Sequence, residues 1–298
     1  MLPFLPPTFA VHISDGVLQP TWEWAGFAAA GLLALFGAWR IRDEEIPRVA
    51  LLTAAFFVAS QIHVQVPAGP STHLLLNGLL GVVLGRRALL AVPVGLFLQV
   101  ILFGHGGFYS LGVNSVVMGL PALLAALLFA GLRRLPWLRR PWFRAALVAG
   151  SVLAFGLSLV YAVTLLVTND PRQLADADPS WADRVTFHPA TLAAAALLAA
   201  LAAWAERRLE HAPEFPLGLV VGESAVLATI LLHTVVLIFG GRERWYSLAL
   251  LTFIIHLPLA VLEGAILGFA VGFLARVKPE MLGWTAPERA ECAAESLP

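Results

Sequence analysis

The sequence predicts an all-α fold, a polytopic transmembrane bundle of about seven to nine hydrophobic helices, from three observations. First, 59% of the 298 residues are hydrophobic and 13% are charged, with a mean hydropathy of +0.82, which is too apolar for a soluble domain. Second, stretches of about 20 apolar residues recur, each long enough to cross ~30 Å of hydrocarbon as a helix. Third, the alternating segments of about ten residues that are typical of a membrane barrel do not occur.

Each expected helix is an apolar run between polar or proline-containing breaks. We expect helices at about 21–40, 48–65, 74–86, 88–104, 112–133, 142–168, 187–208, 217–240 and 249–276. The 74–86 segment is short for a crossing, so a tilted helix, a half-buried helix and a helix continuous with its neighbour remain open. Residues 1–298 are interpreted as a single membrane domain, with an N-terminal metal-binding segment at 1–20, the bundle at 21–278 and a cytoplasmic tail at 279–298.

The positive charges predict an orientation, since Lys and Arg accumulate in cytoplasmic loops. Nine crossings with the N-terminus outside and the C-terminus inside leave few of the nineteen basic residues outside, namely Arg172, Arg184, Arg242 and Arg244. This orientation, in a plasma (inner) membrane, places three segments on the same outer face. They are the stretch around His12, the 66–73 loop and the 104–111 loop.

Composition excludes several classes of protein. The formal net charge of zero argues against nucleic acid as a partner. The single cysteine, Cys292, lies in the polar tail, so the chain cannot form an internal disulfide or a cysteine metal cluster. No G-x-x-x-x-G-K-[ST] loop occurs. An ATP-driven activity would therefore take its ATPase from another subunit.

His12 is the first candidate metal ligand. A histidine at the second position of a polypeptide offers a metal its imidazole, its own amide and the terminal amine, and a fourth nitrogen completes a tetragonal site that suits Ni(II), Cu(II) or low-spin Co(II). As numbered, His12 is the twelfth residue. Initiation at Val11, or processing after Ala10, would restore the terminal chelate and make Val11 a site residue. An ordinary interfacial histidine is the alternative.

His73 is the candidate for the fourth ligand. It ends the loop Pro67–His73, in which Pro and Gly fix the turn while Ser71 or Thr72 can cap the helix that follows. The alternative is a helix-capping loop with an incidental histidine.

Further polar residues are expected to support these two ligands. Four glycines in the nine positions 104–112 allow backbone to pack under an ion or another loop. Polar groups at helix depth need hydrogen-bond partners and can orient ligands. The supporting candidates are Asp15, His63, Gln99, His105 and Asn114. His105 ranks third as a ligand, although a loop histidine is more often solvated.

Two carboxylates and a stripe of small residues complete the candidates. Glu223 and Glu263 lie in apolar helices, where a carboxylate requires a polar partner, and His256 shares a helix face with Glu263. A spacing of four places Gly26, Ala30, Ala34 and Ala38 on one face of the first helix, where a partner helix can approach closely. Alanine is abundant in this helix, so the stripe also arises by chance.

Four motifs carry a resemblance to a known family. They are His-Ile-Ser-Asp-Gly at 12–16, Pro67–His73 followed by Leu74 and Leu75, Leu98-Gln99 running into 104–114 and Met118-Gly119, and the stretch 256–264. In these the chain resembles the substrate-binding S component of the cobalt/nickel energy-coupling-factor (ECF) transporters, the CbiM/NikM family. The resemblance covers the first ~130 residues and the last helix well, and 140–210 poorly.

The resemblance implies a helical membrane protein that binds Co(II) or Ni(II) as the transported substrate. The ligands it implies are the N-terminal amine, the amide and imidazole of the second residue, and one loop histidine, which correspond here to Val11, His12 and His73. It also implies partners: a transmembrane coupling subunit (EcfT/CbiQ-like) that contacts Gly26 to Ala38, ABC ATPases (CbiO-like) and a small CbiN/NikN-like membrane protein. His105 stands where the family has Asp.

The leading hypothesis is capture of Co(II), with Ni(II) a close second, for ATP-driven import by a chain that is not itself an enzyme. Irving–Williams affinities favour Ni over Co at nitrogen sites, so selectivity must come from geometry. A membrane-embedded metalloenzyme with Glu263 as base is an alternative, but it predicts an H-E-x-x-H type motif that is absent here. The third alternative is a structural membrane subunit.

Overall fold

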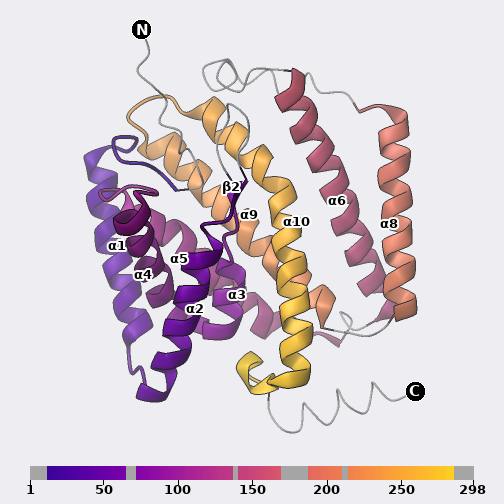
Figure 1. Cartoon of the computed structure of the whole chain (residues 1–298), viewed down its shortest axis with the longest axis horizontal. Coiled ribbons are helices and arrows are strands. Elements are labelled where there is room, and N and C mark those ends of the chain that lie inside the picture. The colour runs from indigo at the N-terminus through magenta and orange to yellow at the C-terminus, as the bar shows by residue number, and fades with distance from the viewer. Residues whose placement is uncertain (1–11, 65–71, 137–139, 169–186, 210–213, 285–298) are drawn as a thin grey trace.

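A computed structural model describes residues 12–64, 72–136, 140–168, 187–209 and 214–284 (Figure 1). Within these ranges it contains nine α-helices, which confirms the all-α prediction. They are α1 (Pro20–Ala38), α2 (Ile46–Ala59), α3 (Asn77–Leu84), α4 (Ala88–Phe103), α5 (Leu111–Leu132), α6 (Pro141–Thr168), α8 (Pro189–Leu209), α9 (Phe215–Gly240) and α10 (Tyr246–Val277). The shorter elements are the 3-10 turns η1 (Asp43–Glu45), η2 (Gly85–Arg87) and η5 (Pro279–Leu282), and the strands β1 (His63–Val64) and β2 (Thr72–His73).

The helices make the chain a multi-pass membrane protein. Among the described residues, six helical segments are long and apolar enough to span a membrane by length and composition, or seven when the pair α1 and η1–α2, bent by 110°, counts as one; one of the six is the combined segment α3–η2–α4, Asn77–Phe103. This is fewer than the nine crossings assumed from the sequence. The reason is length, because α2 and α3 have only 14 and 8 residues, too few to cross ~30 Å of hydrocarbon alone.

Two expected helix boundaries differ from the structure because the backbone there has other partners. The helix expected at 48–65 ends at Ala59, and the one expected at 74–86 begins only at Asn77. Between them, β1 and β2 pair antiparallel, with His63 opposite His73. The short ladder takes up backbone groups of His63 and Val64 that a helix would use, and the N–H groups of Leu75 and Leu76 donate to the Glu263 carboxylate instead of belonging to a helix.

The chain reverses between α3 and α4. A straight helix over the 27 residues Asn77–Phe103 would be about 40 Å long, yet the ring centroids of His73 and His105, just beyond its two ends, lie 5.4 Å apart. The few residues that link these rings to the segment reach only about 20 Å. Gly85 makes the turn with φ +57° and ψ −133°, a conformation that favours glycine. The segment at 74–86 is therefore a separate limb and not a continuation of α4.

Figure 1 shows α9 and α10 crossing the middle of the molecule, with α1–α5 on one side and the α6–α8 hairpin on the other. Gly218 and Gly222 of α9 face Gly268 and Gly264 of α10, so the two backbones are in direct contact. The hairpin is tied together by an ion pair between Arg144 and Glu206. It packs mainly on α10.

Helix ends gather at two opposite ends of the bundle. The histidine end consists of residues 12–19, 60–64, 72–76, 104–111 and 240–245, and is joined by hydrogen bonds such as Gln19 N–H to the Gly240 carbonyl, 2.8 Å. The arginine end consists of residues 39–48, 85–87, 132–136 and 278–284. There the buried Arg87 pairs with Glu45 at 2.8 Å and donates to the carbonyls of Gly37, Trp39 and Arg40.

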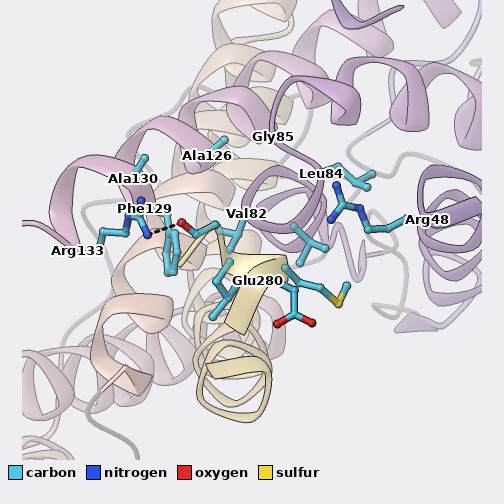
Figure 2. A pocket seen from close by; sticks show the side chains of 13 residues that line it. Arg48, Val82, Leu84, Gly85, Ala126, Phe129, Ala130, Arg133 and Glu280 are labelled. Atoms are coloured by element: carbon cyan, nitrogen blue, oxygen red, sulfur yellow. Dashed lines mark hydrogen bonds between the residues drawn. The ribbon is translucent and has the colours of Figure 1, made fainter. Parts of the chain in front are cut away.

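A cavity of about 300 Å³ opens at the arginine end (Figure 2). Its walls combine the apolar side chains of Val82, Leu84 and Phe129 with the charged side chains of Arg48, Arg133 and Glu280. Arg133 donates a hydrogen bond to the Gly283 carbonyl, 3.1 Å. No histidine lines this cavity, so it is separate from the candidate site described next.

Candidate metal centre

Three histidines from distant parts of the chain meet at the histidine end. The ring centroids of His12 and His73 are 4.8 Å apart, those of His12 and His105 are 5.0 Å apart, and those of His73 and His105 are 5.4 Å apart. One ring nitrogen from each lies within 4.8 Å of the other two. All three residues are less than a tenth exposed. The predicted convergence of the His12, 66–73 and 104–111 segments at one end is confirmed by these distances.

Asn114 holds the backbone next to His12. Its amide oxygen accepts the Ile13 N–H at 2.9 Å, and its amide nitrogen donates to the Ile13 carbonyl at 2.9 Å. The Ser110 hydroxyl donates to the same carbonyl. Both polar backbone groups of Ile13 are thus satisfied inside the protein by α5, and this fixes where the preceding imidazole lies.

Asp15 joins the His12 segment to the glycine-rich loop. Its carboxylate accepts the N–H groups of Phe108 at 2.8 Å, Tyr109 at 2.8 Å and Ser110 at 3.1 Å. These amides precede α5 and would otherwise lack partners. A Cβ on Gly107 would overlap Asp15 Oδ1, so the close approach of the two segments requires glycine there.

Apolar packing completes the attachment of residues 12–18. Ile13, Val17 and Leu18 are buried in one cluster with residues of α5, α9 and α10. The Arg242 N–H donates to the Val17 carbonyl at 2.9 Å, and its guanidinium Nε to the Leu18 carbonyl at 2.6 Å. Residues 12–18 cover the histidine end, with His12 on the inner side, and are called the plug below.

His73 is oriented through its own neighbour. Its Nδ1 is 2.9 Å from the Leu74 carbonyl. In the tautomer with a proton on Nδ1, that nitrogen donates to the carbonyl and Nε2 is left as the donor atom for a metal. This arrangement is typical of metal-ligating histidines.

Glu263 of α10 holds the chain directly after His73. Its buried carboxylate accepts the N–H groups of Leu75 and of Leu76, the latter at 2.9 Å. Leu76 has φ +48°, which is unfavourable for a side chain of this size, and the two bonds hold it there. The sequence indicated that Glu263 needs a polar partner, and the structure identifies that partner as the backbone of the His73 segment.

Asn77 and Thr229 were not singled out from the sequence, although they secure the same segment. The Asn77 amide donates to the Thr229 hydroxyl at 2.6 Å, and the Asn77 side-chain oxygen accepts the Gly78 N–H at 2.9 Å. Both side chains are fully buried. An asparagine within an apolar run was the available signal.

Gln99 supports the third histidine. Its side-chain amide donates to the Ser60 hydroxyl at 2.7 Å, and its backbone carbonyl accepts the backbone N–H of His105 at 3.2 Å. The expectation that His105 is solvated, as loop histidines usually are, is wrong. The residue is 7% exposed because it folds back under the plug formed by residues 12–18.

The remaining candidates are placed as follows. His63 pairs with His73 through the backbone, and Val11 and Pro67–Ser71 lie outside the described residues. His256 is buried in α10, with its Nδ1 2.7 Å from the Thr252 carbonyl.

The small-residue stripe on α1 lies partly inside the chain. Gly26 is buried against Val113 of α5, and Ala30, Ala34 and Ala38 are half-buried. The close approach that Gly26 permits is therefore made to α5. Contact of the stripe with another subunit stays a prediction.

Comparison with known proteins identifies the family. A profile described as "Cobalt uptake substrate-specific transmembrane region", CbiM, matches residues 12–206 and 185–281. A putative metal transport protein of Haemophilus influenzae is 46% identical over 119 residues, which are 40% of this chain and 57% of that protein. A putative cobalt transport protein CbiM 1 of Methanocorpusculum labreanum is 28% identical over 286 residues, 91% of this chain and 92% of that protein.

Two further matches extend the comparison. A fused nickel transport protein NikMN of Rhodobacter capsulatus is 33% identical over 130 residues, 41% of this chain and 38% of that protein. The chain thus spans about half or less of the Haemophilus and Rhodobacter relatives. A crystal structure of a transition metal transporter has a similar fold, with a TM-score of 0.50 and 18% identity over 96% of this chain and 100% of that one. Since the profile matches contain His12, His73, His105 and Glu263, the chain belongs to the CbiM family.

Proposed function

We propose that this chain is the substrate-capture (S) component of an ATP-driven ECF importer for a divalent transition metal, with Co(II) favoured and Ni(II) second. The observation that carries the proposal is the meeting of the His12 and His73 rings, 4.8 Å apart and buried at one end of a membrane bundle. Imidazole suits divalent transition metals. Membership of the CbiM family supports cobalt or nickel as the cargo.

In this proposal His12 and His73 are metal ligands, and Asp15, Gln99 and Asn114 position them. The backbone bonds of Asn114 and Asp15 support that division, because Asn114 holds Ile13, next to His12, and Asp15 joins the His12 segment to the loop that contains His105. Val11 would add the terminal amine. This requires initiation at Val11 or processing after Ala10. Mass spectrometry of the intact native protein tests this point, and a terminus at Met1 together with full metal affinity would contradict it.

The partners are a transmembrane coupling subunit, ABC ATPases and a small NikN-like membrane protein. Two observations support them: the chain has no P-loop motif, and one relative is a fused NikMN protein. Purification of the complex from its native host, with ATPase activity as the readout, tests this assembly. Recovery of the chain alone, with full transport in vesicles, would contradict it.

We further propose an external histidine end, a cytoplasmic arginine end and a plasma membrane location. The grouping of Arg87, Arg133 and other basic residues at the arginine end supports this orientation. The single cysteine, Cys292, allows a direct test with a membrane-impermeant maleimide on intact cells. We expect Cys292 to be protected, and Glu243→Cys in a Cys292→Ser background to be labelled. The opposite pattern would reverse the orientation.

Metal binding by the purified full-length chain tests the function itself. We expect stoichiometric binding of Co(II) and Ni(II), loss of binding in His12→Ala and His73→Ala, and unchanged binding in His188→Ala, a control at the exposed start of α8. Equilibrium dialysis with elemental analysis gives both stoichiometry and affinity. Unchanged binding in both site variants would refute the assignment of the ligands.

A further inference from the structure

His105 lies as close to His12 and His73 as those two residues lie to one another. The centroid distances from His105 are 5.0 and 5.4 Å, against 4.8 Å for the other pair. The planes of His12 and His73 differ by 24°, whereas the His105 ring stands at 86° to the first and 74° to the second. His105 is therefore positioned as a third member of the cluster.

The position of His105 is built into the fold. The Gln99 carbonyl accepts its N–H, and the Gln99 side chain is in turn tied to Ser60 at the end of α2. The next residue, Gly106, lies against His12 and near the Asn114 amide. The imidazole thus enters the cluster from the loop after α4, a segment that contributes neither of the other two histidines.

The three centroids form a nearly equilateral triangle, and this differs from the arrangement of three rings at the corners of a square. With metal–nitrogen bonds of about 2.0–2.1 Å, rings at tetrahedral angles have centroids about 5.2 Å apart. Rings at three corners of a square would instead give two distances of about 4.5 Å and one of about 6.4 Å. The observed range of 4.8–5.4 Å fits three rings on one face of a non-planar site.

We propose that His105 is a third imidazole ligand, and that together with one solvent or substrate oxygen it completes a tetrahedral site that favours Co(II) and Zn(II) over Ni(II). The inference rests on the proposed function, because it takes His12 and His73 as ligands of the same cation. A planar set of nitrogens suits Ni(II) and Cu(II), and a tetrahedral one suits Zn(II). Ni(II) loses more ligand-field stabilisation than Co(II) in tetrahedral surroundings. A third ring outside the plane therefore offsets the higher affinity that Ni(II) usually has for nitrogen ligands.

His105 can act as a ligand whether or not the terminal amine of Val11 also binds the cation. If Val11 supplies an amine, the third imidazole makes the site five-coordinate. If it does not, three imidazoles and one solvent or substrate oxygen make it four-coordinate. Neither site is planar, but only the four-coordinate site is tetrahedral, so the selectivity against Ni(II) belongs to that site.

The test compares the purified full chain with His105→Asp, His105→Gln and, as a control, His188→Gln. We expect Co(II) on the wild type to give the intense visible bands of four- or five-coordinate high-spin Co(II). His105→Asp and His105→Gln should weaken these bands and lower the Co(II)-to-Ni(II) affinity ratio by about tenfold or more, while His188→Gln changes neither. Zn(II) competition should displace Co(II) from the wild type.

The outcomes separate this inference from the proposed function. If the wild type binds no cation, the function itself is wrong. If the wild type binds Co(II) and both His105 variants keep its spectrum and its affinity ratio, the function stands and the third ligand is refuted. Should the variants fail to fold, pulsed EPR of the Cu(II)-loaded wild type counts the coordinated imidazoles directly. Three support the inference and two overturn it.

Discussion

The two ends of the bundle satisfy their backbone groups with different chemistry. At the arginine end, a guanidinium binds the carbonyls that close α1, and Arg48 and Arg133 line the cavity. At the histidine end, Arg242 binds the Leu18 carbonyl, but the neutral amide of Asn114 and the carboxylates of Asp15 and Glu263 bind the backbone groups around the three imidazoles. A guanidinium repels a divalent cation, whereas imidazole binds one. The comparison therefore favours the histidine end for the metal binding that we propose, and substitutions at each end test it.

Among substitutions that leave the three histidines in place, the largest effect on metal binding is expected for Gly107→Ala. The added Cβ overlaps Asp15 and Ser110, so it forces the loop away from the His12 segment and should lower the affinity for Co(II) by about 10- to 100-fold and stability by about 1–3 kcal/mol. Gly31→Ala on α1, where a Cβ meets no atom, is the matched control. Isothermal titration measures both, and equal affinities would show that the contact is dispensable.

Asn114→Ala should have the next largest effect on metal binding. It removes the acceptor for the Ile13 N–H and one of the donors to its carbonyl, at a cost of about 1–3 kcal/mol for the unsatisfied buried group. We expect about a tenfold weaker affinity for Co(II), because His12 is no longer held in place. The control is Ser158→Ala, which loses one helix-internal hydrogen bond in α6. Thermal unfolding and Co(II) titration separate stability from binding, and a loss of stability alone would remove Asn114 from the positioning role.

Glu263→Gln should have a smaller effect on metal binding. The glutamine oxygen can accept one of the two N–H groups of Leu75 and Leu76, but its NH₂ group then faces the other. We expect the affinity for Co(II) to fall several-fold, by about 1 kcal/mol, through a shift of the His73 segment. Glu280→Gln at the arginine end is the control. Identical titration curves for the two variants would show that the Glu263 contact does not affect the site.

The smallest effect on metal binding is expected for Glu45→Gln at the arginine end. It leaves the buried Arg87 without its ion-pair partner, which should lower stability by about 1–3 kcal/mol. The affinity for Co(II) should be unchanged, because the pair acts on the end opposite to the histidines. A weaker affinity measured under conditions where the variant is folded would show that the two ends are coupled.

The sequence predicted the helices and the two leading histidines because both signals are local. Apolar length marks the helices, and His12 and His73 each lie in a short motif next to a helix. The convergence of their segments could be predicted as well, since alternating crossings bring every second loop to the same end. Gln99 and Asn114 gave a further local signal because they are polar residues within apolar helices. Both hold backbone near the histidines.

The remainder depends on contacts between residues far apart in the chain. The left-handed Leu76, for example, is stabilised by the Glu263 carboxylate, which no window around 60–86 contains. The burial of His105 likewise depends on the plug from residues 12–18, more than 80 positions earlier. The residue type and loop position of His105 alone favoured a solvent-exposed side chain, and that expectation was wrong.

The depth of the three imidazoles also determines how an ion can exchange. His12, His73 and His105 are 2%, 1% and 7% exposed, so an ion cannot reach them while the surrounding segments keep these positions. Exchange then requires at least one segment to separate, and the plug is fastened by hydrogen bonds to α5 and to the 240–245 turn. If these residues bind the cargo as we propose, the rates of loading and unloading are set by the opening of the protein around the ion, and an enclosed ion is kept from competing ligands in solution.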